Sequence, residues 1–314
     1  MVDRQPTSLL SFLKIIFGFT LCSQSHSGTA LPVQAASRPL HVLATTYPVW
    51  QLARPLVAGL ENVRLDLLIP AATGCPHDYA PTPADLTKVA GADVILMNGL
   101  GLEAPFAPAL AQAEAHKADC SQGIALLAGS SDHEEEGHEH HYDDNPHVFT
   151  SPAAAARMAG TMAEALIRAC PEQAETIRNN AAALQNSLQD LEKRLAALGA
   201  AHPGASVLLQ HDSLAYMMRS AGLKVMDVLQ ENEEQAPSAA RLLECIEHIK
   251  KERPVLLIGE PQFSPRPLET LAAETGIPVI QLDSLASGPE GTPANYFEQQ
   301  MRNNCQILEN ALSH

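Results

Sequence analysis

The sequence is poor in basic residues. It has 20 lysines and arginines against 36 aspartates and glutamates, so its formal net charge is −16 at pH 7. This balance argues against nucleic acid as a partner, because nucleic-acid binding needs basic patches that face the phosphates. It is compatible with a protein that handles cations, although many soluble proteins are acidic for solubility alone.

Long apolar runs are also scarce, and the one near the N-terminus is short. Arg4 and Lys14 add basic character around an apolar stretch at residues 9–21, and small residues follow up to Ala35. This pattern predicts a signal peptide at residues 1–35 and export to the periplasm. Lipidation of Cys22 is not expected, because Leu21 precedes it where a lipoprotein signal needs a small side chain. Beyond this region no run of about 18 apolar residues occurs, so a soluble mature protein is expected.

Cysteine is rare, with six residues in the chain, of which five remain after the expected cleavage. An odd number implies at least one free thiol or an intermolecular bond. Cys245 and Cys305, both on expected C-terminal helices, are the first candidate disulfide, and Cys120 with Cys170 is the second. Ordinary buried cysteines are the alternative.

Short apolar runs alternate with helical patterns in both halves of the chain. The expected strands are residues 40–45, 63–69, 93–97, 206–210, 224–229, 254–258 and 278–282. The expected helices are residues 50–58, 83–90, 103–115, 213–221, 238–251, 267–275 and 295–312. This alternation predicts the α/β class, with one mainly parallel sheet flanked by helices in each half.

One long helix is expected between the halves, at residues 171–199. Its apolar side chains recur at helical spacing and form a single stripe: Ile177, Leu184, Leu188, Leu191, Leu195 and Leu198. We interpret it as a spine that joins an N-terminal lobe (residues 36–170) to a C-terminal lobe (residues 200–314). A coiled-coil segment for dimerisation is the alternative, and a monomer is favoured.

Three histidines and one aspartate are the candidate metal ligands. His77, His211 and Asp283 each follow an expected strand, and His147 lies in a loop before an expected helix. Ligands bind parallel α/β sheets outside the carboxyl ends of their strands, so two facing lobes would bring these side chains together. Three imidazole nitrogens and one carboxylate oxygen suit a tetrahedral Zn²⁺ site.

An acidic, histidine-rich segment at residues 132–144 lies between the first two of these histidines. It has almost no apolar side chain, so it is not expected to enter a core. Its histidines are candidates for a weak, secondary metal site: His133, His138, His140 and His141. A solvated charged loop without such a role is the alternative.

Several local motifs, taken in order along the chain, resemble one protein family. They are residues 74–86, 91–94, 98–103, 145–148, 211–216, 260–263 and 282–283. Together they resemble the periplasmic solute-binding proteins of zinc and manganese ABC importers (cluster A-I), most of all the zinc-binding ZnuA type. The resemblance implies two α/β lobes joined by one long helix, with the metal between them and an ABC membrane permease as partner.

The same resemblance assigns the metal ligands to His77, His147, His211 and Asp283. In some zinc members of the family, water or another carboxylate takes the place of the fourth ligand, here Asp283. Histidine at position 211, where manganese members usually have glutamate, favours Zn²⁺ over Mn²⁺. The chain departs from the family at Asn145, where aspartate is usual.

Other functions are weighed against metal capture. Three histidines and a bound water would suit an exported zinc hydrolase, with Glu260 as general base. The chain has neither a Gly-x-Ser-x-Gly elbow nor a His-Glu-x-x-His helix, which disfavours hydrolysis. A manganese or dual-metal binding protein and an adhesin on the same fold are further alternatives.

Overall fold

The computed structural model describes residues 38–73, 79–129, 144–230 and 236–313. The expected signal peptide, His77 and the histidines of the acidic segment (His133, His138, His140 and His141) lie outside the described residues. What was expected of them stays a prediction.

Two parallel sheets form the framework. The first sheet has the strand order β2-β1-β3-β4 and the second has the order β6-β5-β7-β8. Their strands are β1 (Leu40–Ala44), β2 (Val63–Leu67), β3 (Val94–Met97), β4 (His116–Asp119), β5 (Ser206–Leu209), β6 (Lys224–Val228), β7 (Leu256–Gly259) and β8 (Val279–Gln281). All pairings between these strands are parallel, which confirms the predicted α/β class. We call the first sheet with its helices the first lobe and the second sheet with its helices the second lobe; the predicted lobe boundaries stay a prediction.

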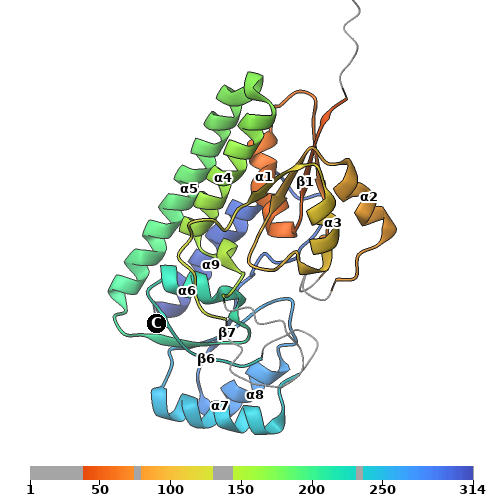
Figure 1. Ribbon diagram of the computed structural model, residues 1–314. Helices are drawn as coiled ribbons and strands as arrows, with labels where there is room; N and C mark the ends of the chain where they lie inside the picture. Colours follow the sequence, from red (N-terminus) through yellow and green to blue (C-terminus); the bar gives the residue numbers. More distant parts are fainter. Residues whose placement is uncertain (1–37, 74–78, 130–143, 231–235, 314) are drawn as a thin grey trace, which may run out of the picture. The chain divides into compact units, whose positions relative to one another are not determined.

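Helices connect the strands and cover both faces of the sheets (Figure 1). They are α1 (Tyr47–Val57), α2 (Pro83–Gly91), α3 (Ala107–Gln112), α4 (Pro152–Ala169), α5 (Ala174–Ala201), α6 (Ala215–Ser220), α7 (Ala239–Glu252), α8 (Arg266–Thr275) and α9 (Tyr296–Leu312). Sequence signals explain several of their starts: Thr82 and Asp85 form a capping box at α2, and the Ser151 side chain accepts from Ala154 N at α4.

Helix α5 is the predicted long helix, with 28 residues. It lies beside α4 (Figure 1), and its leucine stripe faces the main core, with Leu184 and Leu188 at 3% and 0% exposure. The same core includes residues of both sheets and of α9, such as Val42, Ile258 and Met301. Helices of both lobes therefore share one hydrophobic core along α5.

Both sheets reverse their strand order at one point. In the first sheet β1 lies between β2 and β3, and in the second sheet β5 lies between β6 and β7. Connections from such neighbouring strands leave toward opposite sides, which opens a crevice at the carboxyl ends. Asn98 follows β3 and His211 follows β5 shortly after these strands end, so both stand at such an edge.

Strand β4 was not predicted from the sequence. Its four residues, His-Lys-Ala-Asp, contain one apolar side chain and no β-branched residue, so they carry no strand signal. The strand forms because its backbone pairs in parallel with β3, from His116 opposite Val94 to Asp119 opposite Met97.

The expected disulfides are wrong. Cys120, Cys170, Cys245 and Cys305 are all free and buried. Cys245, on α7, packs with Leu208 and Leu257 of the second sheet, whereas Cys305 belongs to the main core. Leu208 alternates along β5 with Val207 and Leu209, which face the main core, so the two thiols lie on opposite faces of the second sheet.

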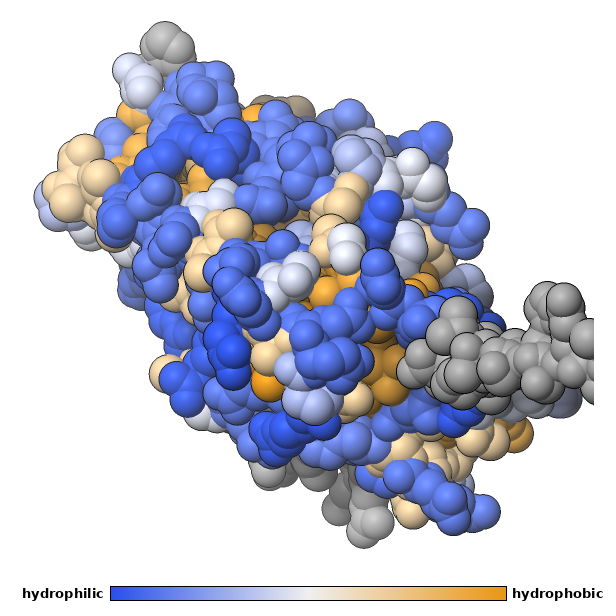
Figure 2. Space-filling model, turned by 90° about the horizontal axis from the view of Figure 1, so that it is seen from above, coloured by the Kyte–Doolittle hydropathy of each residue, from blue (hydrophilic) through white to orange (hydrophobic). Residues whose placement is uncertain are grey.

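The surface is mostly hydrophilic in the view of Figure 2, with small scattered apolar patches. Among the residues described, Leu86, Leu126, Leu243 and Val255 are the large hydrophobic side chains that stay exposed. No helix in the described part of the chain combines the length and the apolar character needed to cross a membrane.

Candidate metal centre

His147 lies in the connection between β4 and α4, immediately before the short 3-10 helix η3 (Val148–Thr150). Its carbonyl oxygen accepts hydrogen bonds from Thr150 N at 3.1 Å and Thr150 Oγ1 at 3.0 Å. Asn98 Nδ2 donates to the carbonyl of Pro146 at 3.0 Å, which ties this loop to the carboxyl edge of the first sheet. His147 itself is 6% exposed.

A buried carboxylate holds the turn that presents Asn98. Glu103 accepts hydrogen bonds from Thr45 Oγ1 at 2.6 Å, Asn98 N at 2.7 Å and Gly99 N at 3.1 Å. Burial raises the pKa of Glu103 to about 7, although these hydrogen bonds act to lower it. The loop of His147 is thus supported by a polar network inside the first lobe.

His211 follows β5 after one intervening residue and caps the short 3-10 helix η5 (Asp212–Leu214). Its Nδ1 accepts a hydrogen bond from Ser213 N at 3.3 Å. One face of the ring stacks on Phe263, with ring centroids 5.2 Å apart and planes at 30°. These contacts restrict the orientation of the imidazole ring. His211 as a whole is 8% exposed.

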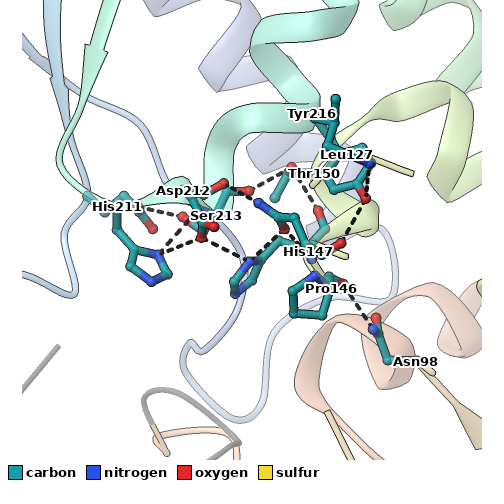
Figure 3. Close-up of polar contacts among 11 residues, drawn as sticks. Asn98, Leu127, Pro146, His147, Thr150, His211, Asp212, Ser213 and Tyr216 are labelled. Atoms are coloured by element: carbon teal, nitrogen blue, oxygen red, sulfur yellow. Dashed lines mark hydrogen bonds and ion pairs between the residues drawn. The ribbon is translucent and has the colours of Figure 1, made fainter. Parts of the chain in front are cut away.

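Asp212 stands between the two histidines, as Figure 3 shows. Its Oδ1 lies 3.5 Å from His147 Nδ1 and 3.7 Å from His211 Nδ1. The two imidazole rings meet edge to face, with centroids 5.4 Å apart. One ligand atom from each of the three residues lies within 4.8 Å of the others, and no other such group of three occurs among the described residues. Two imidazoles and a carboxylate at this spacing are able to hold a divalent ion.

Asn145 joins the two histidine loops. Its Nδ2 donates to the carbonyl oxygen of Asp212 at 3.0 Å, and its Oδ1 accepts from His147 N at 2.9 Å. These two partners fix the orientation of the amide, so the atom 3.0 Å from His147 Nδ1 is the acceptor Oδ1. Nδ1 of His147 therefore carries its proton toward Asn145, and the lone pair of the neutral ring is on Nε2, as metal binding requires.

Asp283 follows β8 at the same edge of the second sheet as His211, but it is not part of this group of three. Its Oδ1 accepts from Gln262 Nε2 at 3.1 Å and from Leu285 N at 2.9 Å. Asn304 on α9 holds its backbone, because Oδ1 accepts from Asp283 N and Nδ2 donates to Asp283 O. The structure thus brings together two of the four predicted ligands, while His77 lies outside the described residues.

Sequence reasoning missed Asp212 and noted Asn145 only as a departure from a family pattern. A signal for Asp212 existed, since it adjoins a candidate ligand at a strand end, where helix-capping and metal-supporting carboxylates both occur. The bond from Asn145 to Asp212 joins residues far apart in sequence, so only the fold reveals it.

Comparison with known proteins agrees with this architecture. The zinc-binding lipoprotein AdcA of Streptococcus pneumoniae (strain ATCC BAA-255 / R6) is 31% identical over 280 residues, which cover 85% of this chain and 55% of AdcA. The chain thus spans about half the length of that relative. The high-affinity zinc uptake system protein ZnuA of Bacillus subtilis (strain 168) is 28% identical over 302 residues, covering 91% of this chain and 92% of that protein.

Among solved structures, a zinc-bound ZnuA deletion mutant lacking residues 138-173 of its own sequence has the same fold. It is 28% identical, with a TM-score of 0.70 over 87% of this chain and 98% of that one. Residues 42–311 match the family described as zinc-uptake complex component A, periplasmic (ZnuA). Since this match spans most of its length, the chain belongs to the ZnuA family of zinc-uptake components.

Proposed function

We propose that this protein captures Zn²⁺ outside the cytoplasmic membrane and delivers it to the membrane permease of an ABC importer. The observation that carries the proposal is the buried group of His147, His211 and Asp212 at the carboxyl edge of the sheets. Imidazole nitrogen and carboxylate oxygen are the ligands that Zn²⁺ prefers when a site contains no thiolate. The names of the AdcA and ZnuA relatives refer to zinc, which supports this choice of ion.

The proposed ligands are His77, His147, His211 and Asp283, as the sequence predicted. In this arrangement Asp212 supports the ligands, because its Oδ1 is near the Nδ1 atoms of His147 and His211. A carboxylate in that position orients the imidazole and raises its basicity.

Delivery to a permease, action as a monomer and export through residues 1–35 belong to the same proposal. The histidines His133, His138, His140 and His141 are proposed to bind Zn²⁺ weakly and raise its local concentration. The central site can bind its ion without any of these additional roles.

We propose no catalytic role. Glu260, the general base that hydrolysis would need, is 1% exposed and accepts a hydrogen bond from Ser213 Oγ. The chain also belongs to a family of transport components. Manganese is disfavoured as the cargo because Mn²⁺ prefers oxygen ligands, whereas three of the four proposed ligands are imidazoles.

Calorimetric titration with Zn²⁺ and with Mn²⁺ tests the proposal. Tight one-to-one Zn²⁺ binding is expected in the wild-type protein and after deletion of residues 132–144, and it should be lost in His211→Ala. His116→Ala is the matched control, because His116 is exposed on β4. Tight binding that survives His211→Ala but disappears with the deletion would overturn the central site and make the histidine-rich segment the metal-binding part.

A further inference from the structure

One connection of the second lobe crosses to the first lobe and is bonded there. It comprises residues 284–295, between β8 and α9, and we call it the strap. Tyr47 on α1 donates from its hydroxyl to Pro289 O at 3.0 Å. Gln51 Nε2 donates to Thr292 Oγ1 at 2.9 Å and to the Tyr47 hydroxyl at 2.7 Å. Tyr47 and Gln51 are 2% and 0% exposed. The bond between them is buried, and their bonds to Pro289 and Thr292 are part-buried.

Arg54, one turn further along α1, completes the contact. Its Nη1 donates to Thr292 Oγ1 at 2.8 Å and to Pro293 O at 3.1 Å, and its Nη2 donates to Thr292 O. The guanidinium lies over the ring of Trp50, 4.6 Å from its centroid. A planar group bonded on its edge and stacked on its face has little freedom to move. One face of α1 therefore holds the C-terminal part of the strap in a single place.

Gly288 allows the strap to approach α1 closely. A Cβ at this position would lie 2.7 Å from the Tyr47 hydroxyl oxygen and 2.8 Å from two ring carbons. The backbone of Gly288 thus packs directly on the Tyr47 ring, which is itself buried and unable to retreat. Any side chain at position 288 must push the strap away from α1.

The strap also touches both connections that carry predicted ligands of the two lobes. Gly288 N donates to the carbonyl oxygen of Ala71 at 2.9 Å, and Ala71 belongs to the connection between β2 and α2, which contains His77. At its other end the strap begins directly after Asp283. There Leu285 N donates to Asp283 Oδ1 while Leu285 adopts a left-handed φ of 63°, which fixes the direction in which the strap leaves.

We propose that the strap is a spacer that sets the separation of the two lobes at the metal centre, with Tyr47 and Gly288 as its positioning residues. This inference rests on the proposed function, since it concerns where Asp283 stands relative to the ligands of the first lobe. A fixed, short separation favours a small ion held by four ligands at about 2 Å, and it disfavours an ion that needs six ligands. The strap thereby contributes to the choice of Zn²⁺ over Mn²⁺.

Two substitutions loosen the strap in different ways. Tyr47→Phe removes only the hydroxyl, and Gly288→Ala moves the backbone away from the ring. Each should weaken Zn²⁺ binding by about tenfold, the lower end of what loss of an outer-shell partner costs a metal site. Each should also lower the ratio of Zn²⁺ to Mn²⁺ affinity and weaken the visible absorption of bound Co²⁺, which is strongest when Co²⁺ has four ligands.

The matched controls are Tyr296→Phe and Gly91→Ala. The Tyr296 hydroxyl accepts a bond from Gln300 on the same helix, and a Cβ on Gly91 would meet nothing within 4 Å. Both controls should bind all three ions as the wild-type protein does. Thermal unfolding of the metal-free proteins is measured alongside, so that a loss of stability is recognised as such.

The outcomes separate the inference from the function on which it rests. Variants with a lower melting temperature but unchanged Co²⁺ absorption and an unchanged Zn²⁺ to Mn²⁺ ratio would overturn the spacer and leave only a stabilising contact. If Gly288→Ala fails to fold, Tyr47→Phe decides alone. A wild-type protein that binds neither Zn²⁺ nor Mn²⁺ would overturn the proposed function itself, and the spacer with it.

Discussion

Replacing Asn145 by alanine is expected to weaken Zn²⁺ binding by roughly tenfold to a hundredfold. The amide makes three hydrogen bonds, one donated to Asp212 O at 3.0 Å and two accepted from His147, at N (2.9 Å) and Nδ1 (3.0 Å). Since Asn145 is 1% exposed, water cannot readily replace them. At about 1 kcal/mol for each net hydrogen bond, the metal-free protein should lose about 3 kcal/mol of unfolding free energy.

Only part of this loss of unfolding free energy affects the affinity for Zn²⁺. The bond to His147 Nδ1 selects the tautomer with its lone pair on Nε2, and a tenfold loss of affinity corresponds to about 1.4 kcal/mol. Without the amide the ring is free to protonate at either nitrogen and to rotate, so Zn²⁺ must order it on binding. The two bonds of the Asn145 side chain to backbone atoms affect stability in the presence and absence of metal alike.

The assay is competition for Zn²⁺ with a chromophoric chelator, combined with urea unfolding of the metal-free protein. Asn180→Ala is the matched control, because Asn180 Nδ2 also bridges two elements, donating to Leu56 O at 3.1 Å and to Ala58 O at 2.9 Å, with no contact to the histidines. It should lower stability and leave Zn²⁺ affinity unchanged. Wild-type affinity in Asn145→Ala, or an equal loss of affinity in Asn180→Ala, would refute the reasoning.

Three further predictions concern the protein without its ion. Glu103 has an ordinary pKa of 4.5 when unfolded and about 7 when folded, so the folded state retains a proton that the unfolded chain releases. Stability should therefore fall by up to about 3 kcal/mol as pH rises through this window, and urea unfolding from about pH 5 to about pH 7.5 should show a flatter profile in Glu103→Gln. Burial raises the pKa of Cys245 to about 12 and of Cys305 to about 11, so alkylation of both thiols should be slow until the protein is unfolded. A disulfide-linked pair of peptides that contain Cys245 and Cys305, found by mass spectrometry of the native protein, would contradict their description as free thiols. Leu188→Ala, at a position with 0% exposure, should cost about 2–5 kcal/mol, whereas Leu243→Ala, at 63% exposure, should stay within about 0.5 kcal/mol in the same denaturation assay.

Much of the fold was predictable because its signals are local. The leucines of α5 repeat at helical spacing, and strands such as β5 (Ser-Val-Leu-Leu) and β7 (Leu-Leu-Ile-Gly) are short apolar runs between turn residues. Strand β4 was missed because its pairing with β3, and not its own residues, makes it a strand. The expected disulfides failed for a related reason. Cys245 and Cys305 were paired because both lie on expected C-terminal helices, but the second sheet separates them.

The candidate metal centre was predictable to the extent that each predicted ligand adjoins a strand end or a Pro-His loop. His147 and His211 satisfy that rule, and the structure places their rings 5.4 Å apart. Asp212 was not predicted, because nothing in the sequence shows that its carboxylate turns back toward both histidines. In the structure His211 ends the extended segment and Asp212 begins the 3-10 helix η5, and this change of backbone direction turns the carboxylate back to the Nδ1 atoms of both rings.

Among the hydrogen bonds that join the lobes in the described part of the chain, two bear directly on predicted ligands. On one side Asn145 bonds to Asp212, which links the loop of His147 to that of His211. On the other side Gly288 bonds to Ala71, which links the strap after Asp283 to the connection that contains His77. A wide hinge motion would break both links and expose the shared core along α5, so the proposed capture of an ion is expected without a wide hinge motion.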